Sequence, residues 1–291
     1  MTIGFIGLGA MGMPMATNLL KAQLPLLVWS RNGANAEKLV GAGATAVASA
    51  AQAAKVDVLF SMLADDQAVS DVFIESGVLD QMPQGSIHVN MATVSVAMAK
   101  KLTQLHAARG VGYVAAPVLG RIDVAAAGNL NILAAGKGQD LERIQHLLDL
   151  MGQKTWRYGE DPAQANVVKI AANFSIACAI ETMAETSALV RAYGIESQAF
   201  IDLLTQTLYP SPVYKGYGTM IAQERYSPAG FKLSLGLKDV RLALEAGEAQ
   251  HLSLPLGSTL RDCHLEAIAQ GDGLLDWAAL GKAAARRGNI D

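Results

Sequence analysis

The chain has 291 residues, 51% hydrophobic and 17% charged, with a formal net charge of −3. This length fits two domains with substantial cores. The charge balance argues against nucleic-acid or anionic-membrane binding, which both need a basic face. No stretch reaches the roughly 18 uninterrupted apolar residues of a membrane span, and "MTIGFIGLGAMGMPMATNLL" lacks the basic start of a signal peptide. We therefore expect a cytoplasmic protein whose two cysteines, Cys178 and Cys263, are reduced core thiols.

The first half of the chain alternates short β-type segments with helical ones. The expected strands are Thr2–Ile6, Leu26–Trp29, Val56–Ser61, Ser86–Asn90, Gly112–Ala115 and Asn131–Ala134. The expected helices are Met11–Lys21, Ala34–Ala42, Asp66–Glu75, Val94–Ala108 and Gln139–Leu150. Strand and helix in turn at this spacing predict a doubly wound α/β domain with a mostly parallel sheet.

After about Trp156 no further strand is expected, and one long helix follows. Asp161 is suited to cap its start, Pro162 to open it, and Gly194 to end it. The rest of the chain shows helical periodicity interrupted by prolines and glycines. The sequence thus predicts an α/β domain over residues 1–160 and an all-helical domain over residues 161–291, joined by the long helix.

A glycine-rich turn stands between the first expected strand and helix. In "IGFIGLGAMGMPMATNLL", Gly7 permits a tight turn, Gly9 lets the backbone approach a pyrophosphate, and Gly12 lets helix and strand pack closely. The helix start then offers free N–H groups to phosphates. This context predicts a Rossmann dinucleotide site, and the alternative is a turn that merely tolerates glycine. The expected contact segment also includes Leu8, Ala10 and Met11.

The end of the second expected strand bears on the choice of dinucleotide. An acidic residue there would hold the ribose 2′-hydroxyl of NAD, but the strand ends in Ser30, Arg31 and Asn32. Arg31 is able to pair with a 2′-phosphate and stack on adenine. We therefore expect NADP as cofactor, with NADPH preferred over NADH. The alternative is a solvated arginine with NAD bound loosely.

Six motifs occur in one order along nearly the whole chain: "GFIGLGAMGMPMATNLL", "SMLADDQAV", "NMATVSV", "APVLGR", "NVVKIAANF" and "LGLKDVRLAL". In this order they resemble the β-hydroxyacid dehydrogenase family, which includes 3-hydroxyisobutyrate dehydrogenase and semialdehyde reductases. The similarity extends more distantly to 6-phosphogluconate dehydrogenase and the imine reductases. It implies a Rossmann domain, a helical domain, and dimers or tetramers formed through the helical domain.

The resemblance also implies roles for particular residues. Met62 and Leu63 would border the nicotinamide ribose, and Thr93 would lie by nicotinamide and substrate. Phe231 and Lys238 would close over cofactor and substrate, with Asp239 orienting that corner. The alternatives are an ordinary strand-end cap for Thr93 and a plain surface ion pair for Lys238 and Asp239.

Lys169 and Asn173 match the family's catalytic lysine and its neighbouring asparagine. Hydride transfer to a carbonyl builds negative charge on oxygen, and a lysine in a dry cleft both stabilises that charge and donates a proton. Burial would lower the pKa of this lysine towards the working range. Asn173 lies one helical turn further on the same face. The alternative is that Lys169 extends from a core helix to solvent.

The expected substrate loop, "AAPVLGRIDVAAAGNL", departs from the family pattern. Ala115 replaces an acid, Leu119 a serine and Arg121 a glycine, while Val118 and Gly120 remain. The usual carboxylate site is therefore changed, and Arg121 either binds a carboxylate itself or points to solvent. Tyr214, in the later segment "LYPSPVYKGYG", either lines a larger pocket or packs between helices, and we slightly favour packing.

The leading hypothesis is an NADPH-dependent oxidoreductase that reduces small aldehydes or ketones of the semialdehyde or glyoxylate type, or oxidises the corresponding β-hydroxyacids. An imine reductase or reductive aminase, and a cofactor-binding module without turnover, are the alternatives, and an intact Lys169 argues against both. The five histidines show no metal-ligand spacing, so no metal site is expected.

Overall fold

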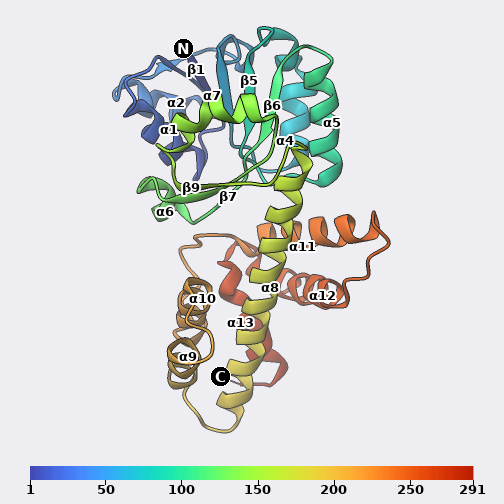
Figure 1. The fold of residues 1–291 in the computed structure, drawn as a ribbon. Helices are drawn as coiled ribbons and strands as arrows, with labels where there is room; N and C mark the ends of the chain where they lie inside the picture. Colours follow the sequence, from blue (N-terminus) through green and yellow to red (C-terminus); the bar gives the residue numbers. More distant parts are fainter. Residues whose placement is uncertain (291) are drawn as a thin grey trace. The chain divides into compact units, whose positions relative to one another are not determined.

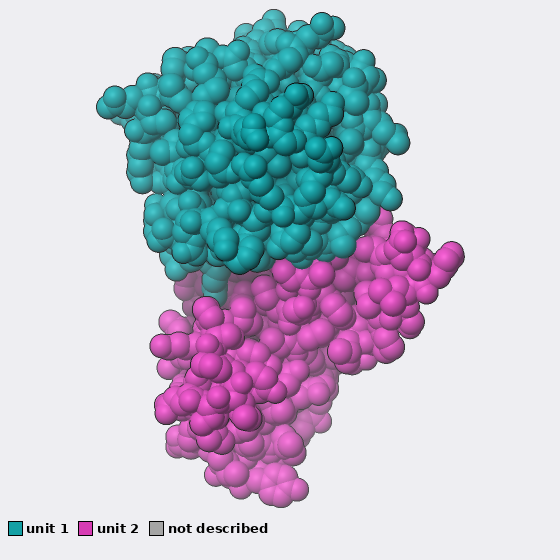
Figure 2. All heavy atoms as spheres, viewed as in Figure 1, with its two compact units in different colours: residues 1–169 teal, residues 170–291 magenta. Residues whose placement is uncertain are grey.

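The computed structural model describes residues 1–290, which divide into two compact units after Lys169 (Figure 2). Unit 1 covers residues 1–169, and unit 2 begins at Ile170. The sequence placed the domain boundary at residues 160/161, before the long helix, whereas this division falls inside that helix.

Unit 1 contains a six-stranded sheet. Its strands are β1 (Ile3–Ile6), β2 (Leu26–Trp29), β3 (Thr45–Ala46), β4 (Val58–Ser61), β5 (Ile87–Asn90) and β6 (Gly112–Ala115). They follow the order β3-β2-β1-β4-β5-β6, and every neighbouring pair is parallel. From β1 the chain adds β2 and β3 on one side of the sheet, and it then returns to add β4, β5 and β6 on the other side. This is the doubly wound arrangement. The predicted fold class is therefore confirmed.

Helices cover both faces of this sheet (Figure 1). Strand side chains alternate between the faces, as Phe60 joins one apolar cluster and its neighbour Leu59 the other. The first cluster includes residues of α1 (Gly12–Leu20), α2 (Gly33–Val40) and α7 (Gly138–Leu148). The second includes residues of α3 (Ala50–Ala53), α4 (Asp66–Ser70) with the π-turn Asp71–Glu75, the 3₁₀ turn Val78–Gln81, and α5 (Val96–Ala107).

A second, smaller sheet completes unit 1. It contains β7 (Val118–Leu119), β8 (Leu130–Ala134) and β9 (Gly152–Arg157), with α6 (Ile122–Ala126) between the first two strands. The sequence grouped Asn131–Ala134 with the parallel strands, but β8 pairs antiparallel with β7 and parallel with β9. It also missed β9, because that edge strand exposes most of its side chains and has no apolar run.

Helix α8 (Ala163–Ala192) begins and ends as predicted. Asp161 Oδ1 accepts a hydrogen bond from the Ala163 N–H at 3.0 Å. Gly194 adopts a φ of +75°, and the Gly194 and Ile195 N–H groups bond back to the carbonyls of Arg191 and Val190 at 2.9 and 3.0 Å. These two bonds form a Schellman motif.

Helix α8 is also long and apolar enough to span a membrane, although 44% of its most apolar window is buried within the protein. Core helices of ordinary globular proteins are often as long and as apolar, so the length and composition of α8 are weak support for a membrane role.

Unit 2 is helical. Its elements are residues 170–192 of α8, then α9 (Ser197–Gln206), α10 (Pro212–Ala222), α11 (Leu233–Glu248), α12 (Pro255–Ala269) and α13 (Leu280–Arg287), with 3₁₀ turns at Asp272–Leu274 and Trp277–Ala279. Pro212 and Pro255 open their helices, because a first-turn residue needs no N–H acceptor. Trp277 lies in the core, and Arg287 ties α13 to Glu181 of α8 and Glu266 of α12.

Candidate cofactor and catalytic site

The predicted cofactor residues of unit 1 all follow parallel strands of one sheet. Parallel strands end at the same edge, so the segments after them gather there. Gly7 follows β1, Ser30 follows β2, Met62 follows β4, and Thr93 lies three residues after β5. The strand order reverses between β1 and β4. Ligands of doubly wound folds bind outside the carboxyl edge at such a switch point.

The glycine turn has the geometry that its sequence predicts. Gly7 has a φ of +97°, and a Cβ there would collide with the Met62 carbonyl oxygen. A Cβ at Gly12 would collide with the Gly7 carbonyl oxygen, so α1 packs directly on the turn. A Cβ at Gly9 would meet no heavy atom within 4 Å. Gly9 thus leaves an open approach before the first N–H groups of α1, and these residues fit a dinucleotide pyrophosphate.

Two side chains beside this turn have local structural roles. Asn35 Nδ2 donates to the Leu8 carbonyl oxygen at 2.9 Å and so holds the glycine turn from α2. Asn32 Oδ1 accepts from the Ala34 N–H at 3.2 Å and caps α2. Arg31, between β2 and this cap, is exposed to solvent, and Ser30 is half-buried. The segment after β2 therefore presents a cation and no acid.

Thr93 lies in a segment that otherwise faces the interior. Met91, Ala92, Val94 and Ser95 are buried, whereas Thr93 is half-buried. The helix cap of α5 is Ser95, whose Oγ accepts from the Met98 N–H at 2.9 Å. The segment after β5 thus exposes one hydroxyl side chain at the sheet edge.

The altered loop "APVLGR" contains β7 and ends at Arg121, directly before α6. Val118 is buried and Leu119 half-buried. Gly120 has a φ of +142°, and a Cβ there would press on Leu130 and Val124. Arg121 precedes α6 and is half-buried. The turn after β7 therefore requires a glycine at position 120. Arg121 lies between this turn and α6.

Lys169 and Asn173 lie one turn apart on α8. Both are buried, with 8% and 5% of their surfaces exposed. A lysine extending to solvent would expose its ammonium group, so this burial argues against the purely structural interpretation. Side chains four residues apart share one helix face, and the helix therefore presents an amine and an amide together.

Asp239 of α11 fixes the orientation of Asn173. The Asn173 amide nitrogen donates to Asp239 Oδ2 at 2.6 Å, and the Lys238 ammonium lies 3.3 Å from Asp239 Oδ1. A carboxylate only accepts hydrogen bonds, so the NH₂ group of Asn173 must face it and the carbonyl oxygen must face elsewhere. Asp239 is only 2% exposed. Lys238 and Asp239 are therefore not a plain surface pair.

Phe231 and Tyr214 are both packed within unit 2. The Phe231 ring lies 5.0 Å from Trp277, and its N–H donates to Asp276 Oδ2 at 3.1 Å. Tyr214 stacks on Tyr209 with ring centroids 4.5 Å apart. The stacking of Tyr214 agrees with the packing role that the sequence favoured.

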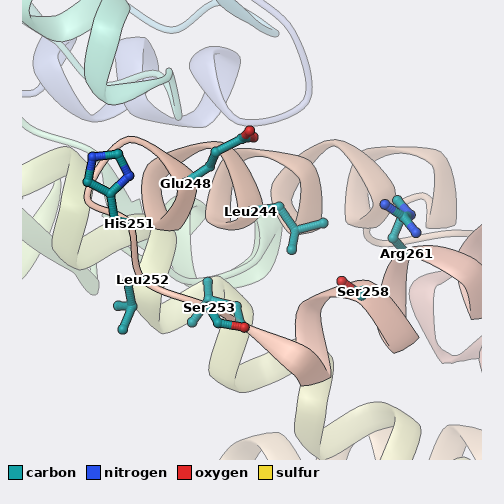
Figure 3. Close-up of a pocket in the computed structure, with 8 residues that line it drawn as sticks. Leu244, Glu248, His251, Leu252, Ser253, Ser258 and Arg261 are labelled. Carbon is teal, nitrogen blue, oxygen red and sulfur yellow. The ribbon is translucent and has the colours of Figure 1, made fainter.

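None of the predicted site residues lines the pocket in Figure 3. It has a volume of about 390 Å³ and is formed by the end of α11, the following loop and the start of α12, with Glu248, His251 and Arg261 in its wall. Within residues 1–290, no group of three or more His, Cys, Asp or Glu residues has the arrangement of a metal site.

Sequence reasoning missed several supporting residues. Asn35 holds the glycine turn, Asp66 and Asn90 bond to the backbone on either side of Thr93, and Asp276 holds Phe231. Only Asn90 carried a signal, as a polar residue at the end of a buried strand. The others lie on neighbouring segments, and pairings of this kind depend on tertiary structure.

Two family models match the chain. The model of the NAD binding domain of 6-phosphogluconate dehydrogenase matches residues 2–159, and that of the NAD-binding domain of NADP-dependent 3-hydroxyisobutyrate dehydrogenase matches residues 163–284. Uncharacterized oxidoreductase YfjR of Bacillus subtilis is 42% identical over 96% of this chain and 98% of its own length. Glyoxylate/succinic semialdehyde reductase 1 of Arabidopsis thaliana is 32% identical over 96% and 97%.

Solved structures agree with these matches. A 3-hydroxyisobutyrate dehydrogenase from Salmonella typhimurium has a TM-score of 0.87 at 28% identity, covering 97% of this chain and 99% of its own. An imine reductase from Myxococcus stipitatus, solved with NADP⁺, shares the fold with a TM-score of 0.66 at 22% identity, covering 97% and 99%. The chain therefore belongs to the family of NAD(P)-dependent dehydrogenases and reductases acting on CH–OH groups to which 3-hydroxyisobutyrate dehydrogenase belongs.

Proposed function

We propose that this enzyme uses NADPH to reduce a small carbonyl acid of the semialdehyde or glyoxylate type, with Lys169 supplying the proton. The observation that carries the proposal is the buried pair Lys169 and Asn173 on one face of α8, with Asp239 fixing the amide of Asn173. An amine and an oriented amide suit a reaction in which oxygen gains charge and then a proton.

Each group has a separate task. The glycine turn and the start of α1 hold the pyrophosphate, and a bound nicotinamide supplies the hydride for the carbonyl carbon. Lys169 donates a proton to the carbonyl oxygen, so the product is an alcohol. Asn173 steadies the substrate oxygen or the Lys169 amine without adding charge. In the oxidative direction, neutral Lys169 accepts the proton of the alcohol.

The substrate class is proposed from two indications. The Arabidopsis relative is named for glyoxylate and succinic semialdehyde, which are both small carbonyl acids. In this chain Arg121 follows β7, where a guanidinium is able to pair bidentately with a carboxylate. We therefore place Val118, Leu119, Gly120 and Arg121 at the acid end of the substrate.

A substrate screen tests this proposal. NADPH consumption is followed with semialdehydes, with glyoxylate and with cyclic imines, and NADP⁺ reduction is followed with β-hydroxyacids. Turnover of the carbonyl acids is the expected result. Preference for imines would support the imine reductase alternative, and tight NADPH binding without any turnover would support the non-catalytic module.

We propose NADPH over NADH because Arg31 follows β2 where no acid is present. The wild-type enzyme should have the higher kcat/KM with NADPH. Arg31→Ala should lower the ratio of the NADPH to the NADH value by about tenfold, the effect of losing roughly 1.4 kcal/mol of binding. An Asn35→Ala variant would weaken use of both cofactors together. Equal wild-type values, or an NADH preference, would refute the proposal.

We also propose a homodimer or tetramer assembled through unit 2. Several large apolar side chains near the end of α8 and on α9 are exposed, including Leu189, Tyr193, Ile195 and Leu203. A contiguous apolar patch marks an interaction surface, and these exposed side chains are our candidates for it. Light scattering after size exclusion should show at least twice the 30.5 kDa chain mass, and Tyr193→Asp should shift it towards the monomer. A monomeric wild-type protein would contradict this.

The cytoplasmic location stays a prediction.

A further inference from the structure

The segment that carries Thr93 is held at both ends by side chains from other elements. On its N-terminal side, Asn90 Oδ1 accepts from the Ala92 N–H at 3.1 Å. On its C-terminal side, Asp66 Oδ1 in the first turn of α4 accepts from the Ser95 N–H at 2.8 Å. The two anchored N–H groups lie one residue before and two residues after Thr93. This spacing leaves little freedom for the backbone between them.

A buried chain of hydrogen bonds runs from His106 through His88 to Ser61, beside Asn90. His106 Nδ1 lies 2.7 Å from the Leu102 carbonyl, which only accepts, so His106 must donate there. Its Nε2 then accepts from His88 Nδ1 at 2.9 Å, and His88 Nε2 accepts from the Ser61 hydroxyl at 2.8 Å. Burial lowers the pKa of both histidines, that of His106 to about 4, which keeps them neutral and the donor order fixed.

With this donor order, the Asn90 carbonyl oxygen accepts mainly from one group. Ser61 has a single hydroxyl proton, which His88 takes, so the 3.3 Å contact from Ser61 to Asn90 Oδ1 is the weaker one. Asn90 Nδ2 donates to the Tyr113 hydroxyl at 3.1 Å, which fixes the amide. The Ala92 N–H is therefore the main donor to Asn90 Oδ1.

We propose that Asp66 and Asn90 are positioning residues that hold the Met91–Ser95 segment so that Thr93 is presented to the nicotinamide and substrate. The inference rests on the proposed function, since it takes Thr93 to contact them. The burial of Met91, Ala92, Val94 and Ser95 against the half-buried Thr93 shows that the anchored segment exposes this one side chain. Neither Asp66 nor Asn90 needs to touch a ligand for this role.

Asp66 allows the sharper test, because it is half-buried and has an isosteric replacement. Asp66→Ala removes the acceptor of the Ser95 N–H, whereas Asp66→Asn keeps a carbonyl oxygen for it. The assay is a single turnover with bound NADPH and the carbonyl acid that the substrate screen identifies. Asp66→Ala should slow hydride transfer in it by about 10- to 100-fold, the effect expected from a small misplacement of Thr93. Asp66→Asn should restore most of the rate, and the Kd for NADPH should stay within about threefold in both.

Asp65→Ala is the matched control. Asp65 Oδ1 caps α4 by accepting from the Ala68 N–H at 2.8 Å, so its loss weakens the same helix without removing the bond to Ser95. A general loss of structure lowers the amplitude of the single turnover, because fewer molecules are active. Loss of the positioning of Thr93 instead lowers the rate of hydride transfer in the molecules that remain folded. An Asp66→Ala variant with the wild-type rate, or an equal loss of rate in Asp65→Ala, would overturn the inference.

A double-mutant cycle separates this inference from the proposed function. If Asp66 acts through Thr93, the Asp66→Ala change should have little further effect in a Thr93→Ala enzyme. If the rate loss in the double variant equals the product of the two single losses, the positioning role is overturned, while Thr93 stays in the site. An unchanged rate in Thr93→Ala alone would overturn both the placement of Thr93 and this inference. Folded Asn90→Ala protein should show the same non-additivity with Thr93→Ala, and a wild-type rate would remove Asn90 from the proposal.

Discussion

The glycine turn of unit 1 and the Asn173–Asp239 pair of unit 2 are built in different ways. The turn uses backbone shape, since Gly7 and Gly12 admit no Cβ and Gly9 keeps an open approach. The pair uses a single side-chain bond between α8 and α11, 66 residues apart in the sequence. Backbone shape leaves a local signature of glycines, whereas a side-chain bond depends on tertiary packing. The glycine turn is therefore easier to predict from sequence than the Asn173–Asp239 pair.

The largest expected effect separates chemistry from cofactor binding. Lys169→Met keeps the length and burial of the side chain but removes the proton donor. Its kcat should fall by about 10²- to 10⁴-fold, the usual contribution of a general acid. Fluorescence titration should show NADPH binding within a few-fold of wild type, because the glycine turn does not depend on the amine. Near-normal kcat would show that the lysine only fills space.

The second prediction concerns the orientation of Asn173. Asp239→Asn replaces a pure acceptor with a group that both donates and accepts, so the amide of Asn173 loses its fixed direction. We expect kcat to fall by about 10- to 100-fold, with the Kd for NADPH nearly unchanged.

The control for this substitution is Asp262→Asn, which alters an exposed aspartate paired with Arg261 on α12. It should leave kcat unchanged. Wild-type kcat in a folded Asp239→Asn enzyme would show that the bond to Asn173 has no catalytic consequence.

The third prediction distinguishes Gly12 and Gly9 by mechanism. Gly12→Ala places a methyl group against the Gly7 carbonyl, so thermal unfolding of the cofactor-free protein should shift downwards, corresponding to about 1–3 kcal/mol of overpacking. Gly9→Ala meets nothing within 4 Å, so the unfolding temperature should hold while the Kd for NADPH rises about tenfold. Equal loss of stability in both variants would contradict an open approach at Gly9.

The last prediction concerns the pH dependence of stability. Burial lowers the pKa of His88, His106 and His264 below the ordinary 6.5. The unfolded chain then binds more protons than the folded one below about pH 6.5. Stability is complete above that pH and falls as pH decreases towards the folded pKa values, about 4 for His106. Each histidine contributes at most about 1.4 kcal/mol per pH unit.

Urea unfolding at pH 7.5, 6 and 5 measures this slope. Equal unfolding free energies at pH 7.5 and 5 would refute the prediction.

Sequence patterns predicted the large sheet and the bounds of α8 because those elements have buried apolar runs and clear caps. They failed at β9, whose exposed edge has no such run, and at β3, which has only two residues. They also missed Asp66, because an acid in a first helical turn is common and its bond to Ser95 spans 29 residues. The roles of Lys169 and Arg31 were proposed from residue type and order, and they remain predictions.

The central claim is that Lys169 transfers a proton, and amine rescue tests it most directly. Lys169→Ala enzyme saturated with NADPH is assayed with increasing methylamine, and with tetramethylammonium as a cation that carries no transferable proton. If Lys169 transfers the proton, the rate should be low without amine, rise with methylamine and not respond to tetramethylammonium. Wild-type activity without any amine, or equal rescue by both cations, would contradict it.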